Sequence, residues 1–323
     1  MRKTGSIVIG VSVAALATAV GLATGPGGIG LFPGPEIMAV RLPRVLLGWV
    51  AGIGLAAAGT ALQAVLGNPL AEPYLLGVSG GAACGMALAL ILGLSAGMLG
   101  AVALPLFSFA FGLATIGLVY RLARVQGRLP AETIILSGVV VNAFFSGAIM
   151  LMMSLAGKQL QEMIYILMGN LGLLFTRDSV PLFAVAALLT AAGTLWLWRQ
   201  GRSLNLLSLG EAPAASLGVD VARLKQAVFL VTALMTAALI SLTGVIGFVG
   251  LIVPHLGRML CGPDNRRLIP LAALLGGSLL VVSDTLARSL VAQEIPVGVV
   301  TALLGVPFFV FLIWQKKRSM SGR

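Results

Sequence analysis

The sequence predicts an all-α, polytopic membrane protein, and three observations support this fold class. Of its 323 residues, 59% are hydrophobic and 10% are charged, and the mean hydropathy is +1.06. This balance leaves too few polar residues to cover the surface of a water-soluble domain. Apolar runs of about 20 residues, long enough to cross a bilayer as helices, recur along the whole chain. The runs lack the polar–apolar alternation of barrel strands, so we expect helices.

We expect about ten membrane-spanning helices, because ten apolar runs follow one another with short interruptions. Lipid offers the backbone no hydrogen-bond partner, so each span must satisfy its own amide groups as a helix. The eighth run is short for a full crossing. The predicted spans are 5–24, 44–66, 74–94, 98–120, 131–155, 179–198, 223–243, 248–261, 268–288 and 297–315.

The clearest boundary lies between the second and third spans. The second span stops at a turn with two prolines, Asn68–Pro73, and the third starts with glycines at every fourth position, Gly77, Gly81 and Gly85. Such a turn predicts a short, rigid reversal. Glycines spaced by four residues let helix backbones approach closely, so we expect tight packing there.

The positions of lysine and arginine predict that both termini are cytoplasmic. With that orientation, sixteen of the 21 basic residues lie on the cytoplasmic side, as the positive-inside rule requires. This distribution accounts for most of the formal net charge of +11, so nucleic acid need not be invoked as a partner. Residues 1–24 resemble a signal peptide, but cleavage would leave nine spans, so we expect an uncleaved helix. The outer side keeps Arg41, Arg44, Lys158, Arg177 and Arg288.

Only two connections between the predicted spans are long. Residues 156–178, on the outer side, include GKQLQEMIYILMGN, which we expect to form a short helix at the surface. Residues 199–222, on the cytoplasmic side, contain Gly210 between two short stretches, which predicts two short helices interrupted there. The remaining turns leave no room for a soluble catalytic domain, so we expect residues 1–323 to form a single transmembrane domain.

Few side chains are suited to chemistry. No P-loop is present, so another subunit must hydrolyse ATP if transport uses it. His255 is the only histidine, and no segment holds two carboxylates at the spacing of an acid–base pair, which argues against an intramembrane enzyme. Cys84 and Cys261 show no metal-ligand spacing. We therefore expect no catalytic residue, no metal site and no cofactor on this chain.

Several charged groups stand in places where membrane proteins seldom keep them. Asp284 lies well inside a span and Arg288 follows four residues later, the spacing of an ion pair on a helix. Either Asp284 anchors Arg288, or it carries the coupling ion of a proton- or sodium-driven transporter. Arg41, Arg44 and Arg288 would suit carboxylates of a docking protein if exposed. Ordinary snorkelling to the interface is the alternative.

The cytoplasmic loop offers a second candidate surface. It carries several leucines from Leu204 onwards, followed by GEAPAASLG at 210–218. Two short helices would present an apolar face flanked by charge. Such a face could seat in a groove of a partner protein or lie on lipid headgroups, and the residues alone do not choose between these.

Six stretches of the sequence resemble one known family, in the same order and over nearly the whole chain. They are RLPR at 41–44, GTALQAVLGNPLAEPYLLGVSGGA at 59–82, LSLGEAPAASLGV at 207–219, GVIGFVGLIVPHLGRMLCGPDNRRLIP at 244–270, GGSLLVVSDTLARSL at 276–290 and EIPVGVVTALLGVPFFVFLI at 294–313. The family is FecCD, the permease subunits of binding-protein-dependent ABC importers for iron–siderophore complexes, haem and cobalamin. One departure lies at Ile166 and Leu167, where the family usually has a tryptophan.

The resemblance implies the type II ABC importer permease fold, with ten helices, in the bacterial cytoplasmic (inner) membrane. The implied partners are a second permease copy or homologue, two cytoplasmic ABC ATPase subunits that hold ATP and magnesium, and a periplasmic or extracellular substrate-binding protein. Within 199–222, the implied ATPase-coupling residues are Glu211, Ala212, Leu217 and Gly218. The implied docking residues are Arg41, Arg44 and Arg288. The residues that match regions near the cytoplasmic gate are Asn68, Leu70, Ala131 and Glu132.

Polarity within the spans adds three residues that we expect to line the transport route, Ser79, Ser137 and Asn142. The expected function is therefore passage of a large metal chelate, with ferric siderophore as the default and haem or cobalamin as alternatives. The competing hypothesis is the ion-coupled transporter that uses Asp284. The sequence selects neither the chelate nor a homodimer over a heterodimer.

Overall fold

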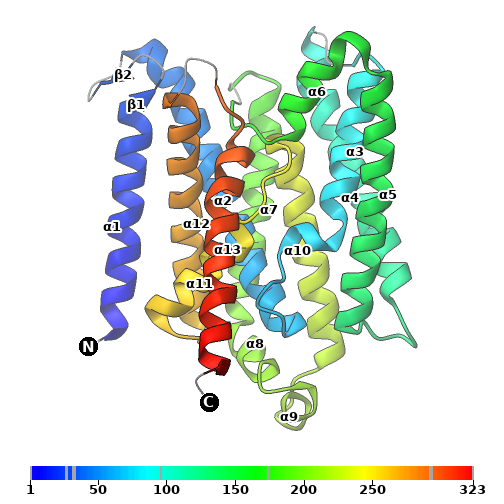
Figure 1. The fold of residues 1–323 in the computed structure, drawn as a ribbon, viewed down its shortest axis with the longest axis vertical. Helices are drawn as coiled ribbons and strands as arrows, with labels where there is room; N and C mark the ends of the chain where they lie inside the picture. The colour runs from blue at the N-terminus through cyan, green and yellow to red at the C-terminus, as the bar shows by residue number, and fades with distance from the viewer. Residues whose placement is uncertain are drawn as a thin grey trace.

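The computed structural model describes residues 2–321 apart from 26–27, 31–33, 95–96, 173–174 and 291–293. Long helices run roughly parallel to one axis and form a bundle (Figure 1). They are α1 (Arg2–Ala23), α2 (Pro35–Leu66), α3 (Val78–Ile91), α4 (Gly97–Ala123), α5 (Ala131–Leu155), α7 (Ser179–Arg199), α10 (Val221–Thr243), α11 (Val249–Cys261), α12 (Asn265–Ser289) and α13 (Val297–Ser321).

Short elements connect these helices at the two ends of the bundle. The antiparallel pair β1 (Thr24–Gly25) and β2 (Gly28–Ile29) follows α1. The others are the 3-10 helices η1 (Pro73–Leu76) and η2 (Gly157–Gln159) and the helices α6 (Leu160–Leu167), α8 (Gly201–Leu207) and α9 (Glu211–Ser216). The short outer helix and the two short helices on either side of Gly210, both predicted from the sequence, are therefore present.

Each of the ten predicted spans overlaps one long helix of the structure. Among the described residues, seven helices are long and apolar enough to cross a membrane, and three shorter apolar helices are Val78–Ile91, Val249–Cys261 and Val297–Phe311. Helix α1 begins, and α13 ends, at the end of the bundle that also carries α8 and α9 (Figure 1). The number of crossings and the side on which the termini lie stay predictions.

The predicted start of the second span is wrong by nine residues, because α2 begins at Pro35 and not at residue 44. Proline is tolerated in the first turn of a helix, where its missing N–H has no partner in any case. The third span was placed too early at 74, because residues 73–76 form η1 and Gly77, with φ of +77°, separates η1 from α3.

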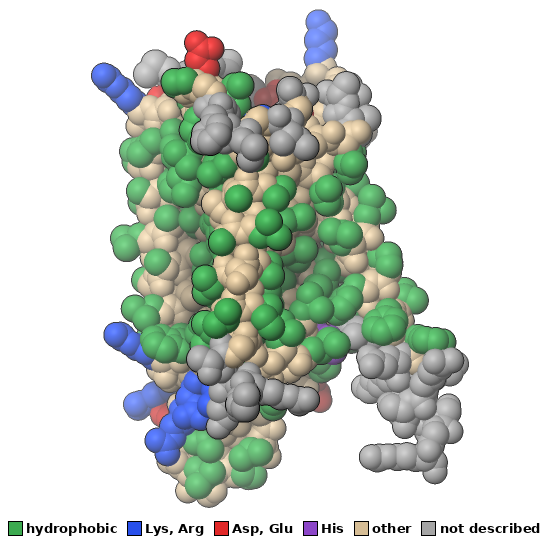
Figure 2. Space-filling model, turned by 90° about the vertical axis from the view of Figure 1, so that its left-hand side faces the viewer, with side chains coloured by type: hydrophobic (Ala, Val, Ile, Leu, Met, Phe, Trp, Pro, Cys, Tyr) green, Lys and Arg blue, Asp and Glu red, His purple; other side chains and the backbone are tan. Residues whose placement is uncertain are grey.

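The surface has the polarity of a membrane protein. Figure 2 shows hydrophobic side chains over the middle of the molecule, while Lys, Arg, Asp and Glu lie toward its two ends. Lipid can cover an apolar belt of this kind, and charged side chains reach water on both sides of it.

Helix α2 lies at the centre of the bundle because glycines let its neighbours approach. A Cβ atom added to Gly52 would lie 2.2 Å from the carbonyl oxygen of Gly276 in α12. One added to Gly59 would lie 2.0 Å from the carbonyl oxygen of Gly250 in α11. In α3, a Cβ atom on Gly85 would lie 2.4 Å from the Phe107 oxygen of α4, so the tight packing expected there is confirmed.

Candidate functional site

The most irregular backbone inside the bundle lies between α10 and α11. Residues 244–248 leave the helical path, and the two ends of this segment, Gly244 and Phe248, have φ of +66° and +69°. Non-helical backbone at membrane depth is tolerated only where protein buries it or where it lines a watery cavity. We refer to residues 244–248 as the α10–α11 break.

Two other segments meet at this break, and hydrogen bonds join them to the residue before it and to each other. The N–H of Asn170 donates to the carbonyl oxygen of Thr243 at 2.7 Å. The N–H of Val297 donates to the Gly169 oxygen at 3.0 Å. A Cβ atom on Gly298 would lie 2.2 Å from the Met168 oxygen, so this approach requires glycine. Segments from three distant parts of the chain therefore hold one another in place.

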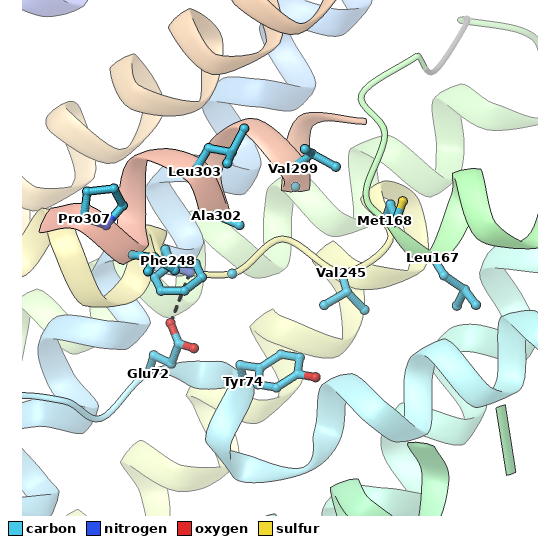
Figure 3. A pocket seen from close by; sticks show the side chains of 13 residues that line it. Glu72, Tyr74, Leu167, Met168, Val245, Phe248, Val299, Ala302, Leu303 and Pro307 are labelled. Atoms are coloured by element: carbon cyan, nitrogen blue, oxygen red, sulfur yellow. Dashed lines mark hydrogen bonds between the residues drawn. The ribbon is translucent and has the colours of Figure 1, made fainter. Parts of the chain in front are cut away.

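A cavity of about 760 Å³ opens beside the break (Figure 3). Figure 3 shows α13 on one side of residues 245–248, and Glu72 and Tyr74 on the other. The cavity is mostly apolar, and Glu72 is its one acidic lining residue. Its lining residues are Glu72, Tyr74, Leu167, Met168, Val245, Gly247, Phe248, Gly298, Val299, Ala302, Leu303, Val306 and Pro307.

Glu72 joins the turn after α2 to the break. Its Oε2 atom accepts a hydrogen bond from the backbone N–H of Phe248 at 3.2 Å, drawn as a dashed line in Figure 3. Phe248 is the N-cap of α11, so the carboxylate lies at the positive end of that helix. Glu72 is not among the residues that the sequence predicts as functional, although it lies in the predicted turn Asn68–Pro73. The sequence signal for a functional role of Glu72 is an isolated carboxylate between Ala71 and Pro73.

The predicted gate residues lie in two segments, the turn before η1 and the first turn of α5. The Asn68 side-chain oxygen accepts from the Leu70 N–H at 2.9 Å, which closes the turn before η1. Ala131 begins α5, and Glu132 is exposed in its first turn. Helix α5 packs on η1, where a Cβ atom on Gly138 would lie 2.0 Å from the Leu75 oxygen. None of the four gate residues lines the large cavity.

The three residues predicted to line the route lie on two helices that pack together, α3 and α5. Ser79 is buried in α3, while Ser137 and Asn142 are partly buried in α5. The Asn142 oxygen is directed at α3, since a Cβ atom on Gly80 would lie 2.2 Å from it. That oxygen has no hydrogen-bond partner in the part of the chain that the structure describes. None of the three belongs to the lining of the large cavity.

At the opposite end from α9, the three arginines predicted to dock a binding protein are buried within this chain, and their docking role stays a prediction. Arg41, Arg44 and Arg288 are 6%, 8% and 1% exposed. Helix α2 extends through Arg41 and Arg44, which therefore pack within the bundle and do not hang from a loop.

Their partners lie within the chain. Arg44 binds both carboxylate oxygens of Glu294 at 2.9 Å, and its Nε lies 3.6 Å from Asp284. The other Asp284 oxygen lies 3.3 Å from the Nε of Arg288, which confirms the predicted i,i+4 ion pair. The hydrogen bond from Arg44 holds the pKa of Glu294 below its usual value. Both oxygens of Asp284 are thus engaged by arginines.

The same arginines hold the end of α1. Arg41 donates to the carbonyl oxygen of Leu22 at 2.8 Å, and Arg288 donates to that of Gly21. The last carbonyl groups of a helix have no partner within the helix, so these guanidinium groups satisfy them. We call Arg41, Arg44, Asp284, Arg288 and Glu294 the outer charge cluster.

The predicted coupling residues form the tip at the other end. Gly210, with φ of +118°, separates α8 from α9, and Gly218, with φ of +85°, follows it. Leu217 is exposed. Glu211 binds the buried Lys225 at the start of α10.

A groove of about 470 Å³ lies between α9 and the turn before α5. Glu211 and Ala212 line it on one side, and Leu129 and Pro130 on the other. Pro130 directly precedes Ala131, so the predicted coupling helix faces the segment that leads into the predicted gate.

The chain is similar to known proteins over most of its length. The FecCD transport family matches residues 30–315 of the chain. The cobalamin import permease BtuC of Halobacterium salinarum is 40% identical over 278 residues, covering 86% of this chain and 73% of BtuC. The hemin transport permease HmuU of Yersinia pestis is 40% identical over 290 residues, covering 88% of this chain and 84% of HmuU.

A solved structure also resembles the whole fold. It is an inward-facing ABC transporter assigned to the metal-chelate type. It superposes with a TM-score of 0.83 and 30% sequence identity, over 96% of this chain and 99% of that one.

Proposed function

The chain belongs to the FecCD transport family, and from that premise we propose that it is the permease subunit of a binding-protein-dependent ABC importer for a large metal chelate. The observation that carries the proposal is the match over residues 30–315, together with a bundle of ten long helices among the described residues that is interrupted at the α10–α11 break. Broken helices that surround a cavity are typical of transport sites.

The proposed cargo is a ferric siderophore, with haem and cobalamin as the alternatives. The names of BtuC and HmuU support the last two classes, and both relatives are equally identical to this chain at 40%. All three ligands are large, so each needs a wide route, which a second permease copy or homologue would complete. The mostly apolar 760 Å³ cavity would belong to that route.

The energy source would be a pair of cytoplasmic ATPase subunits that bind the α8–α9 tip. When they close on ATP and magnesium, the two permease subunits would rock and open the route. A substrate-binding protein would dock at the opposite end. For Arg41, Arg44 and Arg288 to contact it directly, they would have to exchange their internal partners for carboxylates of that protein.

The engagement of Asp284 supports an ATP-driven mechanism over ion coupling. A coupling ion needs a carboxylate that it can reach and leave, whereas each oxygen of Asp284 faces an arginine. The outer charge cluster is a structural ion-pair network in this proposal.

The test is affinity purification of the tagged chain from native membranes in mild detergent, followed by reconstitution in liposomes. We expect a P-loop ATPase in near-equal amount, and uptake that requires ATP inside and survives an ionophore. The proposal would be contradicted if the chain is recovered without an ATPase and the ionophore abolishes uptake. That result would favour the ion-coupled transporter with Asp284 as the coupling residue.

A further inference from the structure

The α10–α11 break is held from two sides at Phe248. The residue has φ of +69°, in the left-handed region that side chains other than glycine rarely occupy. On one side, its ring lies against Gly305 of α13, where an added Cβ atom would lie 2.3 Å from the ring Cγ. On the other side, its N–H donates to the Glu72 carboxylate at 3.2 Å (Figure 3).

The residue after Glu72 makes a second contact with the start of α11. A Cβ atom on Gly250 would lie 2.7 Å from the Cδ of Pro73. Gln63 of α2 donates to the Gly250 oxygen at 3.1 Å. The first turn of α11 therefore packs against the end of α2 and the segment that leads into η1, and Glu72 supplies a charged contact between them.

The segment between α2 and η1, residues 67–72, also contains the predicted gate turn. Leu70 lies two residues before Glu72, and the turn is closed by hydrogen bonds from the N–H groups of Leu70 and Ala71 to the side-chain and main-chain oxygens of Asn68. Two hydrogen bonds within four residues make a stiff turn. A displacement of Glu72 would therefore displace Leu70.

We propose that Glu72 is a positioning residue of the transport route, which holds the gate turn against the α10–α11 break through the Phe248 N–H. Movement of α11 or α13 then reaches Leu70 through this hydrogen bond. The inference rests on the proposed function, in which Leu70 belongs to the cytoplasmic gate.

The experiment compares Glu72→Ala with Glu72→Gln, since the glutamine amide keeps an oxygen acceptor for the Phe248 N–H. Spin labels at Leu70→Cys and Met259→Cys report the distance between the gate turn and α11, and both positions are exposed. Both native cysteines, Cys84 and Cys261, are replaced first, so that only the introduced cysteines carry a spin label.

Reconstituted with its ATPase, each variant also gives the amount of cargo moved per ATP. Glu36→Ala, an exposed carboxylate at the start of α2, is the matched control.

We expect Glu72→Ala to broaden the label distance and to lower cargo moved per ATP about fivefold, the change that one lost hydrogen bond makes to an equilibrium. Glu72→Gln and Glu36→Ala should match the parent protein. Gly305→Ala, which pushes the Phe248 ring from the other side, should shift the label distance with Glu72 intact.

Unchanged distances and coupling in folded Glu72→Ala would overturn the inference, and so would equal impairment in Glu72→Gln. If Glu72→Ala does not fold, the other two variants test the inference. It is overturned if Gly305→Ala leaves the spin-label distance unchanged. It is also overturned if Glu72→Gln moves less cargo per ATP than the parent protein. A parent protein that co-purifies with no ATPase would instead contradict the proposed function.

Discussion

At the scale of single residues, the outer charge cluster shows how the chain tolerates buried charge. Asp284 lies between Arg44 and Arg288, and Glu294 engages Arg44 from the loop before α13. Two carboxylates thus pair with Arg44 and Arg288, while Arg41 binds the carbonyl oxygen of Leu22. Removing one member of such a network leaves an uncompensated charge, which costs more than the pair contributes when complete.

We predict that Asp284→Asn destabilises the protein strongly, by about 3 kcal/mol or more. Glu294→Gln should cost less, because the Glu294 side chain is 35% exposed and Arg44 keeps Asp284. Thermal unfolding in detergent measures both, with Glu36→Gln as an exposed control. A stable Asp284→Asn protein that loses only uptake would argue for a transport role of Asp284.

Asp264, in the turn between α11 and α12, gives a prediction about pH. Hydrogen bonds from Arg266 are the main cause that lowers its pKa from 3.8 to about 2, and its side chain also accepts from Asn205. Because the folded-state pKa is depressed, the stability that this carboxylate contributes is fully present above its unfolded pKa. It is lost as the pH falls through about 2.

We therefore predict that Asp264→Ala lowers the free energy of unfolding by about 1 kcal/mol, the usual cost of a lost N-cap. Unfolding of both proteins in detergent from pH 7 downwards should show a constant difference to about pH 4, near the ordinary pKa of aspartate, and a smaller one below it. A difference that vanishes between pH 7 and pH 5 would contradict the assignment.

The sequence predicted the Asp284–Arg288 pair because both residues lie on one helix, four positions apart. It did not predict Glu294 or the burial of Arg44, because those contacts join α2 to a loop 250 residues away. The distribution of basic residues along the sequence predicts only the side of the membrane on which Arg41, Arg44 and Arg288 lie. Burial depends on how helices pack, which no local pattern contains.

At the scale of elements, glycines determine how closely the central helices approach. A Cβ atom on Gly59 would overlap the Gly250 oxygen, which is backbone and cannot rotate away. In contrast, a Cβ atom on Gly147 of α5 meets nothing within 4 Å. The two positions therefore form a matched pair for the same substitution.

We predict that Gly59→Ala lowers the free energy of unfolding by about 1–3 kcal/mol, because α2 and α11 must separate. Gly147→Ala should be neutral or stabilise by up to about 1 kcal/mol through its better helix propensity. Melting temperatures in detergent compare the two directly. Equal melting temperatures would show that the α2–α11 contact is not tight.

The predicted helix boundaries agree with the structure where the local sequence signal is strong, and they differ from it where that signal is weak. Gly210 was recognised as a break, and α8 and α9 end and begin on either side of it. The start of α2 was missed because charged and proline residues between 35 and 44 resemble a loop. The α10–α11 break coincided with a span boundary, but its role in closing a cavity required contacts from residues near 170 and 297.

At the scale of the whole molecule, the α9 tip and the turn into α5 share one groove. Glu211 already binds the buried Lys225 there. Substitution by arginine would place two cations side by side, whereas glutamine keeps a hydrogen-bonding group. The two changes therefore separate loss of charge from disruption of the tip.

We predict that Glu211→Arg abolishes co-purification of the ATPase, while Glu211→Gln keeps most of it. Thermal unfolding of the isolated permease should be measured beside the pull-down, because Glu211→Arg leaves the buried Lys225 without its carboxylate partner and is expected to destabilise the tip. Normal ATPase recovery with Glu211→Arg would remove α9 from the proposed coupling surface.

The hydrogen bonds from Arg41 and Arg288 to the end of α1 have a consequence for the synthesis of the protein. The bond from Arg288 to the Gly21 oxygen joins residues 267 positions apart. At typical rates of synthesis, roughly ten seconds to a minute separates the emergence of the two partners from the ribosome. During that interval the first helix of the nascent chain lacks α12, its main neighbour. The order of translation thus leaves the N-terminal segment open to membrane chaperones and proteases until the ninth long helix has been inserted.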